Sequence, residues 1–324
     1  MKLETMLCYL DGNNIVLITR PRNKIYIPFK SHPHFDRIRT DVHGEITLKI
    51  NKDRTIGVYI PFIEEIEKIP QRNIVSIDVN ERSIDLALLT PLGFSFESLD
   101  TSSISTTHYT YSLKRRSIAK NLNLCIHDEK NKRKTLLQKY GNKEKNKIKH
   151  SIHDIANKVV ELVKKNDAIV VMEKLAGIRQ SNSRQKNLNH WQQCKSKKIR
   201  RRLNRWNFRQ FQKYVEYKSN SAGYLVEYVN PRDTSKVCLK CGKKTKINGQ
   251  IFTCNHCGYT INRHFLATIN IAGKYLKNQN VASSVPAERQ QMKMMHGAFR
   301  KCKETIIQGA ICNENVETIS TILS

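Results

Sequence analysis

Residues 73–100, NIVSIDVNERSIDLALLTPLGFSFESLD, decide the fold because apolar runs alternate here with short turns. A run at 74–79 precedes an Asn-Glu-Arg turn at 80–82, and a second run precedes a Pro-Leu-Gly turn at 91–93. Apolar and β-branched runs bounded by turn residues are typical of strands. We therefore expect three consecutive strands in this stretch.

The residues that follow predict helices and further strands. Residues 110–166 read as helical, with one apolar face formed by Ile152, Ile155, Ala156, Val159 and Val163. AIVVME at 168–173 reads as a buried strand and YLVEYVN at 224–230 as another. A strand hairpin followed by a helix and a strand is an α/β order.

The segments on either side of this region differ from it in composition. Residues 1–70 contain IVLITRP, KIYIPFK, EITLKIN and IGVYIPF, four β-rich runs separated by turn residues, which predict a small β module. The helix predicted after residue 260 ends near residue 278. The tail at 281–324 is mixed and shows no clear chemistry.

The charge indicates the class of partner. The chain has 324 residues with 57 Lys and Arg against 28 Asp and Glu, a net charge of +29. Such an excess favours a polyanionic partner, most often nucleic acid, over a merely solvated basic surface. No apolar run reaches the roughly 20 residues that span a bilayer, and MKLETMLCYLDGNNIVL lacks the features of a secretory signal. We expect an intracellular protein with no membrane partner.

Basic and aromatic residues interleave in KSKKIRRRLNRWNFRQFQKYVEYK. The aromatic spacing favours core packing of Phe211 and Tyr214 over base stacking. The density of positive charge favours phosphate contact over a solvated helix face. The predicted nucleic-acid-binding residues are Lys195, Lys197, Lys198, Arg200, Arg201, Arg202, Arg205 and Arg209.

Two CxxC pairs form the most specific local motif. Cys238 and Cys241 make the first pair, Cys254 and Cys257 the second, and a glycine follows each. Four thiolates favour a closed, structural zinc site, with an iron–sulfur site or chance cysteines as alternatives. We expect His256, inside the second pair, to be a bystander and not a ligand.

Two acids stand within apolar strands, Asp78 in IVSIDVN and Glu173 in IVVME. Burying a carboxylate is costly unless something pairs with it. The two side chains either converge on divalent cations, as two-metal phosphodiester chemistry requires, or form structural ion pairs with the many basic groups.

The residues resemble a known family over about 45–275: SIDVN, VVMEKL, and a CxxC…CxxC ribbon followed by N-R-x-x-x-A-x-x-N are similar to the TnpB (OrfB) proteins of transposons, relatives of the type V CRISPR effectors. The resemblance implies an α/β, RNase H-like (RuvC-type) mixed sheet with flanking helices, an inserted zinc ribbon and a small N-terminal β module. It also implies an RNA-guided DNA endonuclease, in which a guide-like noncoding RNA reads the DNA.

By position, Asp78 matches the first RuvC acid and Glu173 the second. Pro231, Thr234 and Ser235 match the segment that leads into the ribbon. The third acid belongs to an Asp-Arg-Asp segment, which here reads Asn262-Arg263-His264. Arg263, Ala267 and Asn270 keep the register, so the third catalytic position is occupied by His264.

The implied domains are a partial wedge-like β-barrel module at 1–70, a RuvC-like domain with a basic helical segment at 71–230, the zinc ribbon at 231–260, a final RuvC-like helix at 261–280 and the tail at 281–324. The implied cofactors are structural Zn²⁺ and, only if the chain is catalytic, Mg²⁺ or Mn²⁺. A short N-terminal part implies a reduced grip on RNA and DNA.

Three functions follow. The favoured hypothesis is a transposon-associated protein that binds RNA and DNA, with cleavage impaired by His264, because histidine is a poor magnesium ligand. The alternatives are an active metal-dependent, RNA-guided DNA endonuclease and a decayed transposon remnant.

Overall fold

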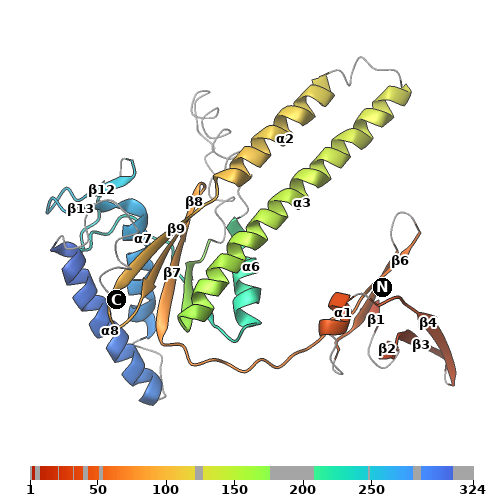
Figure 1. Ribbon diagram of the computed structural model, residues 1–324, viewed down its shortest axis with the longest axis horizontal. Coiled ribbons are helices and arrows are strands. Elements are labelled where there is room, and N and C mark those ends of the chain that lie inside the picture. Colours follow the sequence, from red (N-terminus) through yellow and green to blue (C-terminus); the bar gives the residue numbers. More distant parts are fainter. Residues whose placement is uncertain are drawn as a thin grey trace, which may run out of the picture. The chain divides into compact units, whose positions relative to one another are not determined.

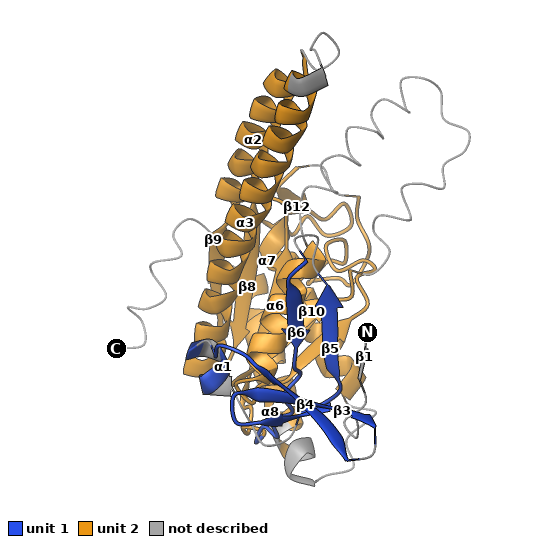
Figure 2. Cartoon of the chain, turned by 90° about the vertical axis from the view of Figure 1, so that its right-hand side faces the viewer, with its two compact units in different colours: residues 1–67 blue, residues 68–324 orange. Residues whose placement is uncertain are grey.

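The computed structural model divides the chain into two compact units, residues 1–67 and 68–324 (Figure 2). Each unit has its own core and is described by itself. The structure describes residues 2–3, 8–20, 22–31, 33–38, 43–50, 54–120, 127–175, 208–246, 249–279 and 286–308.

The first unit is built from short antiparallel strands, as its β-rich runs predict. One sheet has the order β2-β3-β4 and the other β1-β5-β6, and both close around buried Cys8, Ile15 and Ile46. The elements are β1 (Lys2–Leu3), β2 (Cys8–Asp11), β3 (Asn14–Arg20), β4 (Asn23–Pro28), α1 (Pro33–Ile38), β5 (Ile46–Ile50) and β6 (Ile56–Tyr59).

The second unit is organised around a mixed sheet of five strands in the order β11-β10-β7-β8-β9 (Figure 1). The three strands predicted for residues 73–100 are present and pair antiparallel with one another, whereas β10 lies parallel to both β7 and β11. The strands are β7 (Asn73–Val79), β8 (Ser83–Leu89), β9 (Phe94–Asp100), β10 (Ala168–Glu173) and β11 (Val226–Val229). The predicted mixed α/β architecture is confirmed.

Helices cover both faces of this sheet. Because side chains alternate along a strand, Val75 and Ile77 enter one core with α3 and α6, whereas Ile74 enters a second core with α7 and α8. The predicted apolar stripe of α3 is buried in the first core. The helices are α2 (Ser102–Lys120), α3 (His127–Lys165), α6 (Phe208–Asn220), α7 (Arg263–Gln279) and α8 (Pro286–Ile307). None of the described helices is long and apolar enough to cross a membrane.

One sequence expectation needs revision. The helical region begins at Ser102 and not at residue 110, because Asp100 accepts hydrogen bonds from the backbone N–H and the hydroxyl of Ser102 and so supports the first turn.

The described part of the tail contains the helix α8, for which the sequence suggested no role. This helix packs Met295 and Ile306 into the core beside α7.

Candidate active site

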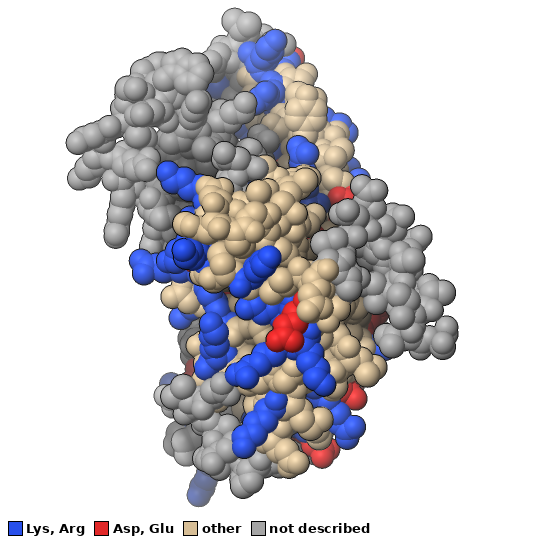
Figure 3. Space-filling model, turned by 90° about the vertical axis from the view of Figure 1, so that its left-hand side faces the viewer, with Lys and Arg blue, Asp and Glu red and all other residues tan. Residues whose placement is uncertain are grey.

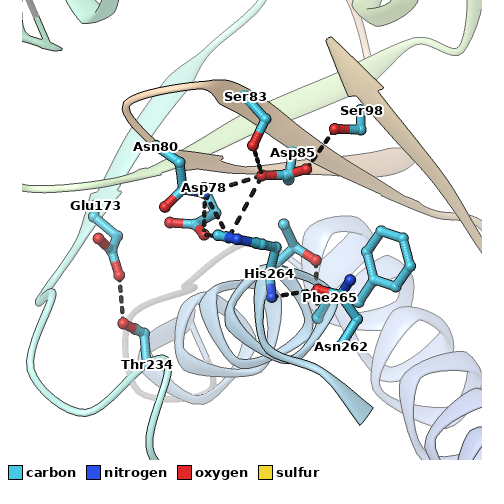
Figure 4. Close-up of polar contacts among 11 residues, drawn as sticks. Asp78, Asn80, Ser83, Asp85, Ser98, Glu173, Thr234, Asn262, His264 and Phe265 are labelled. Atoms are coloured by element: carbon cyan, nitrogen blue, oxygen red, sulfur yellow. Dashed lines mark hydrogen bonds and ion pairs between the residues drawn. The ribbon is translucent and has the colours of Figure 1, made fainter. Parts of the chain in front are cut away.

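Strand alternation places three carboxylates on the face of the sheet that α7 covers. Asp78 follows Ile74 and Ser76 along one side of β7, and Glu173 follows Val171 on β10. The hairpin register sets Asp85 of β8 directly opposite Asp78. Asp78 and Asp85 therefore belong to neighbouring strands yet point in the same direction (Figure 4).

The start of α7 brings His264 to these acids. The Oδ1 atom of Asn262 accepts a hydrogen bond of 2.9 Å from the backbone N–H of His264, which is the arrangement of a helix N-cap. From this first turn, His264 Nδ1 lies 3.5 Å from Asp78 Oδ2 and 3.6 Å from Asp85 Oδ2. His264, which the resemblance aligns with the third acid, therefore lies beside Asp78.

Asn80, in the turn between β7 and β8, contacts all three of these side chains. Its Nδ2 atom lies 2.8 Å from Asp78 Oδ2, 2.9 Å from Asp85 Oδ2 and 2.8 Å from His264 Nδ1. The ligand atoms of the two acids and the histidine all lie within 4.8 Å of one another. Glu173 is not a member of this group.

Asp85 is the residue that sequence reasoning missed. The residue is 3% exposed, and its oxygens accept hydrogen bonds from Ser83 Oγ at 2.7 Å and Ser98 Oγ at 2.6 Å. An acid inside the apolar run SIDLALL carries the same signal as Asp78 in IVSIDVN. The sequence did not predict which residues of the two strands pair, and this pairing makes the two acids neighbours.

Glu173 lies at the end of β10, one residue beyond the last register pair with β7, Met172 and Ile77. The pKa of its carboxyl is raised from 4.5 to about 7, chiefly by burial and also by the nearby Asp78, against the lowering effect of a hydrogen bond donated by Thr234. Asn270 of α7 donates hydrogen bonds of 2.7 and 3.0 Å to the backbone oxygens of Thr234 and Val237, which holds the segment that leads into the ribbon.

The four cysteines of the CxxC pairs come together. Sγ atoms of Cys238 and Cys257 lie 3.6 Å apart, and those of Cys241 and Cys254 lie 3.5 Å apart. Tetrahedral zinc with bonds of about 2.3 Å separates its sulfurs by roughly 3.8 Å, so the donor set fits zinc. Glycines after each pair have φ of +72° and +69°, which the turn backbone requires. The adjoining strands are β12 (Ile251–Thr253) and β13 (Thr260–Asn262). His256 is exposed and outside the cluster.

Most of the predicted phosphate-binding residues lie outside the described residues, namely Lys195, Lys197, Lys198, Arg200, Arg201, Arg202 and Arg205. Arg209 is described and exposed on α6, with its guanidinium 5.6 Å from the ring centroid of Tyr228. On the same helix Phe211 is fully buried and Tyr214 packs against the core, as their spacing predicts.

A second basic surface lies on the hairpin of α2 and α3. Its exposed members are Lys114, Arg116, Lys120, Lys132, Lys134, Lys139, Lys143, Lys145, Lys147 and Lys149. On the face of the molecule that Figure 3 shows, Lys and Arg outnumber Asp and Glu. The described part of the chain therefore carries enough exposed positive charge to contact a polyanion.

Comparisons with known proteins show what this chain is similar to. The protein-family model of the Cas12f1-like TNB domain matches residues 208–271, a range that includes the four clustered cysteines and His264. Among solved structures, a Cas12f1–sgRNA–target DNA complex aligns at 20% identity and a TM-score of 0.46, covering 70% of this chain and 55% of that one. The chain thus spans about half the length of that solved protein.

Curated relatives are more similar. The CRISPR-associated endodeoxyribonuclease Cas12f2 of a Micrarchaeota archaeon is 34% identical over 43% of this chain and 26% of its own length. TnpB-like protein MJ0751 of Methanocaldococcus jannaschii is 34% identical over 297 residues, which cover 89% of this chain and 99% of that protein. The chain belongs to the TnpB-like proteins.

Proposed function

We propose that this TnpB-like protein binds a guide-like RNA and DNA, and that Mg²⁺-dependent DNA cleavage is impaired by His264. The observation that carries the proposal is the position of His264, whose Nδ1 lies 3.5 Å from Asp78 where the family's third acid is expected. Mg²⁺ prefers oxygen ligands, and an imidazole nitrogen at this point neither supplies one nor balances the charge of the ion.

Binding does not depend on that residue. The net charge of +29 and the exposed lysines of the α2–α3 hairpin support contact with phosphates. The cysteine cluster supports a zinc-stabilised ribbon next to the site. Guided binding can therefore persist when cutting is weak, and such a protein would occupy target DNA without cleaving it efficiently.

A specific observation favours a second candidate, an active RNA-guided endonuclease. Asp85 adds a carboxylate beside Asp78. Glu173 lies outside that group but near enough to Asp78 for the two charges to interact, so three acids remain around the site. If Asp85 binds the metal ion in place of the third acid, the wild-type protein would cleave DNA with Mg²⁺ or Mn²⁺.

The deciding experiment is a cleavage assay on the protein purified with its co-purifying RNA. The bound RNA is sequenced to define the guide and its target, and cutting of that target is then followed in Mg²⁺ and in Mn²⁺. We expect a discrete RNA, slow cutting by the wild type in Mg²⁺, and at least about tenfold faster cutting by His264→Asp, since one added carboxylate strengthens ion binding at the reacting centre.

The matched control is His256→Asp, the same change at an exposed histidine outside the cluster. It should leave the cutting rate at the wild-type level. Wild-type cutting in Mg²⁺ as fast as that of His264→Asp would reject impaired catalysis and favour the endonuclease. Recovery of only random RNA fragments would reject guided binding.

A further inference from the structure

The polar cluster beside α7 has a composition that a carboxylate-only magnesium site does not have. Its members come from three elements: Asp78 from β7, Asp85 from β8 and His264 from the first turn of α7. Two carboxylate oxygens and one imidazole nitrogen form a mixed oxygen and nitrogen donor set. Such sets suit divalent transition metals, whereas Mg²⁺ prefers oxygen alone.

The spacing of the donor atoms matches a small ion. His264 Nδ1 lies 3.5 and 3.6 Å from the two carboxylate oxygens. A tetrahedral ion with ligand bonds of about 2.0–2.2 Å holds its ligand atoms roughly 3.3–3.6 Å apart. The two nitrogen–oxygen distances therefore match those around one ion, and the two carboxylate oxygens lie within 4.8 Å of each other. With three ligands from the protein, a fourth position on the ion would remain open.

The hydrogen bonds within the cluster converge on one amide group. The Nδ2 atom of Asn80 lies 2.8–2.9 Å from Asp78 Oδ2, Asp85 Oδ2 and His264 Nδ1. Its two hydrogens can be donated to the two carboxylates, and the ring nitrogen accepts or donates according to its tautomer. The arrangement concentrates two carboxylates and a ring nitrogen around one point, where a cation would interact with all three together.

The carboxylates are also held in place. Asp85 is 3% exposed and both of its oxygens accept hydroxyl hydrogen bonds, from Ser83 and Ser98. Asn262 fixes the helix turn that carries His264. Ligands oriented by such partners bind metals more tightly than mobile ones.

We propose that Asp78, Asp85 and His264 form a binding site for one divalent transition metal ion, of the Zn²⁺ or Mn²⁺ class, separate from the cysteine cluster and not requiring Glu173. This inference is independent of the proposed function, because it concerns ion binding by the protein alone and holds whether or not the chain cuts DNA.

The test is a Mn²⁺ titration of the full chain loaded with one zinc ion per chain, so that zinc fills the cysteine cluster alone, followed by electron paramagnetic resonance without nucleic acid. Mn²⁺ does not displace zinc from four thiolates, so added Mn²⁺ reports on the second site. We expect one Mn²⁺ per chain with nitrogen hyperfine coupling from the imidazole. Asp85→Asn should weaken binding by at least about tenfold, and His264→Asp should bind Mn²⁺ without the nitrogen coupling.

One further variant is a control, and a second tests whether Glu173 takes part in binding the ion. Glu97→Gln removes an exposed carboxylate from β9, one residue before Ser98 and on the opposite face of the strand, and should leave Mn²⁺ affinity unchanged. Glu173→Gln should also retain binding. Zinc content and thermal unfolding establish that each variant is folded. If Asp85→Asn does not fold, the nitrogen coupling of Mn²⁺ in the wild type, compared with His264→Asp, still tests the site.

The proposal is overturned if the wild type binds no Mn²⁺, in which case the cluster is only a hydrogen-bonded network. It is also overturned if the bound ion shows no nitrogen coupling, or if Glu173→Gln abolishes binding while Asp85→Asn does not. In that last case the ion lies between Asp78 and Glu173.

Discussion

At the residue scale, Glu173 is the acid whose ionisation the fold resists most clearly. Burial raises the pKa of its carboxyl from 4.5 to about 7, against the lowering effect of the Thr234 hydrogen bond. The folded chain therefore retains this proton to higher pH than the unfolded chain does. The stability that the protonated group contributes is fully present below pH 4.5 and is lost as the pH rises to about 7.

We therefore predict that Glu173→Gln removes this loss. In urea unfolding without Mg²⁺ or Mn²⁺, the advantage of the variant over the wild type should grow between about pH 4.5 and 8, reaching on the order of 3 kcal/mol. Glu97→Gln, which alters an exposed glutamate, is the control. Parallel pH curves for wild type and Glu173→Gln would contradict the burial of an unfavourable charge.

At the scale of elements, the α2–α3 hairpin is joined by a buried acid. Glu144 of α3 is 6% exposed, and its carboxylate contacts His108 Nδ1 at 2.7 Å and the guanidinium of Arg115, both on α2. A buried carboxylate between two basic groups on the partner helix sets how the two helices pair.

Glu144→Gln should lower the free energy of unfolding by about 1–3 kcal/mol, since hydrogen bonds to a charged group are replaced by weaker ones. Glu161→Gln, at an exposed glutamate of the same helix, should change it by less than about 0.5 kcal/mol. Urea denaturation of the two variants makes the comparison. An equal effect of both would mean that the ionic interaction between the helices is not stabilising.

The ribbon is an element whose structure depends on a metal. We predict that the four cysteines hold one zinc ion, and that elemental analysis of Cys254→Ser shows one zinc per chain fewer than the wild type, because a three-thiolate site binds the ion far more weakly. Cys302→Ser is the matched control. Cys302 is buried on α8 and belongs to no group of possible metal ligands among the described residues. Full zinc content in Cys254→Ser would rule out the four-thiolate site.

At the scale of the whole molecule, charge determines affinity for nucleic acid. The logarithm of the binding constant should fall linearly with the logarithm of salt concentration. Replacing Lys143, Lys145 and Lys147 of α3 with Gln should make that slope shallower by about 0.7–0.9 for each phosphate that the protein no longer neutralises. Fluorescence anisotropy with a labelled RNA measures both quantities.

The charge-preserving triple replacement of the same lysines with Arg should leave the slope unchanged. An unchanged slope in the Gln variant would mean that the RNA phosphates bind elsewhere on the chain. A binding constant independent of salt would reject phosphate binding altogether.

The sequence by itself determined the features that depend on residues close together along the chain. The CxxC spacing predicted the cysteine cluster, apolar periodicity predicted the strands and the buried face of α3, and the family register located His264. These patterns are local consequences of strand and helix geometry, so they can be read without tertiary contacts. The helix α8 was not predicted, although its buried residues Met295, Ala298, Cys302 and Ile306 recur at helical spacing.

Only the tertiary structure decided which acids meet. Asp85 becomes a neighbour of Asp78 through the register of the β7–β8 hairpin, and His264 reaches Asp78 across a separation of 186 residues. Glu173 ends the adjacent strand but stays outside the close group. Distances between side chains depend on how strands pair and where a helix begins on the sheet. For this reason the sequence named the histidine and the structure identified its partners.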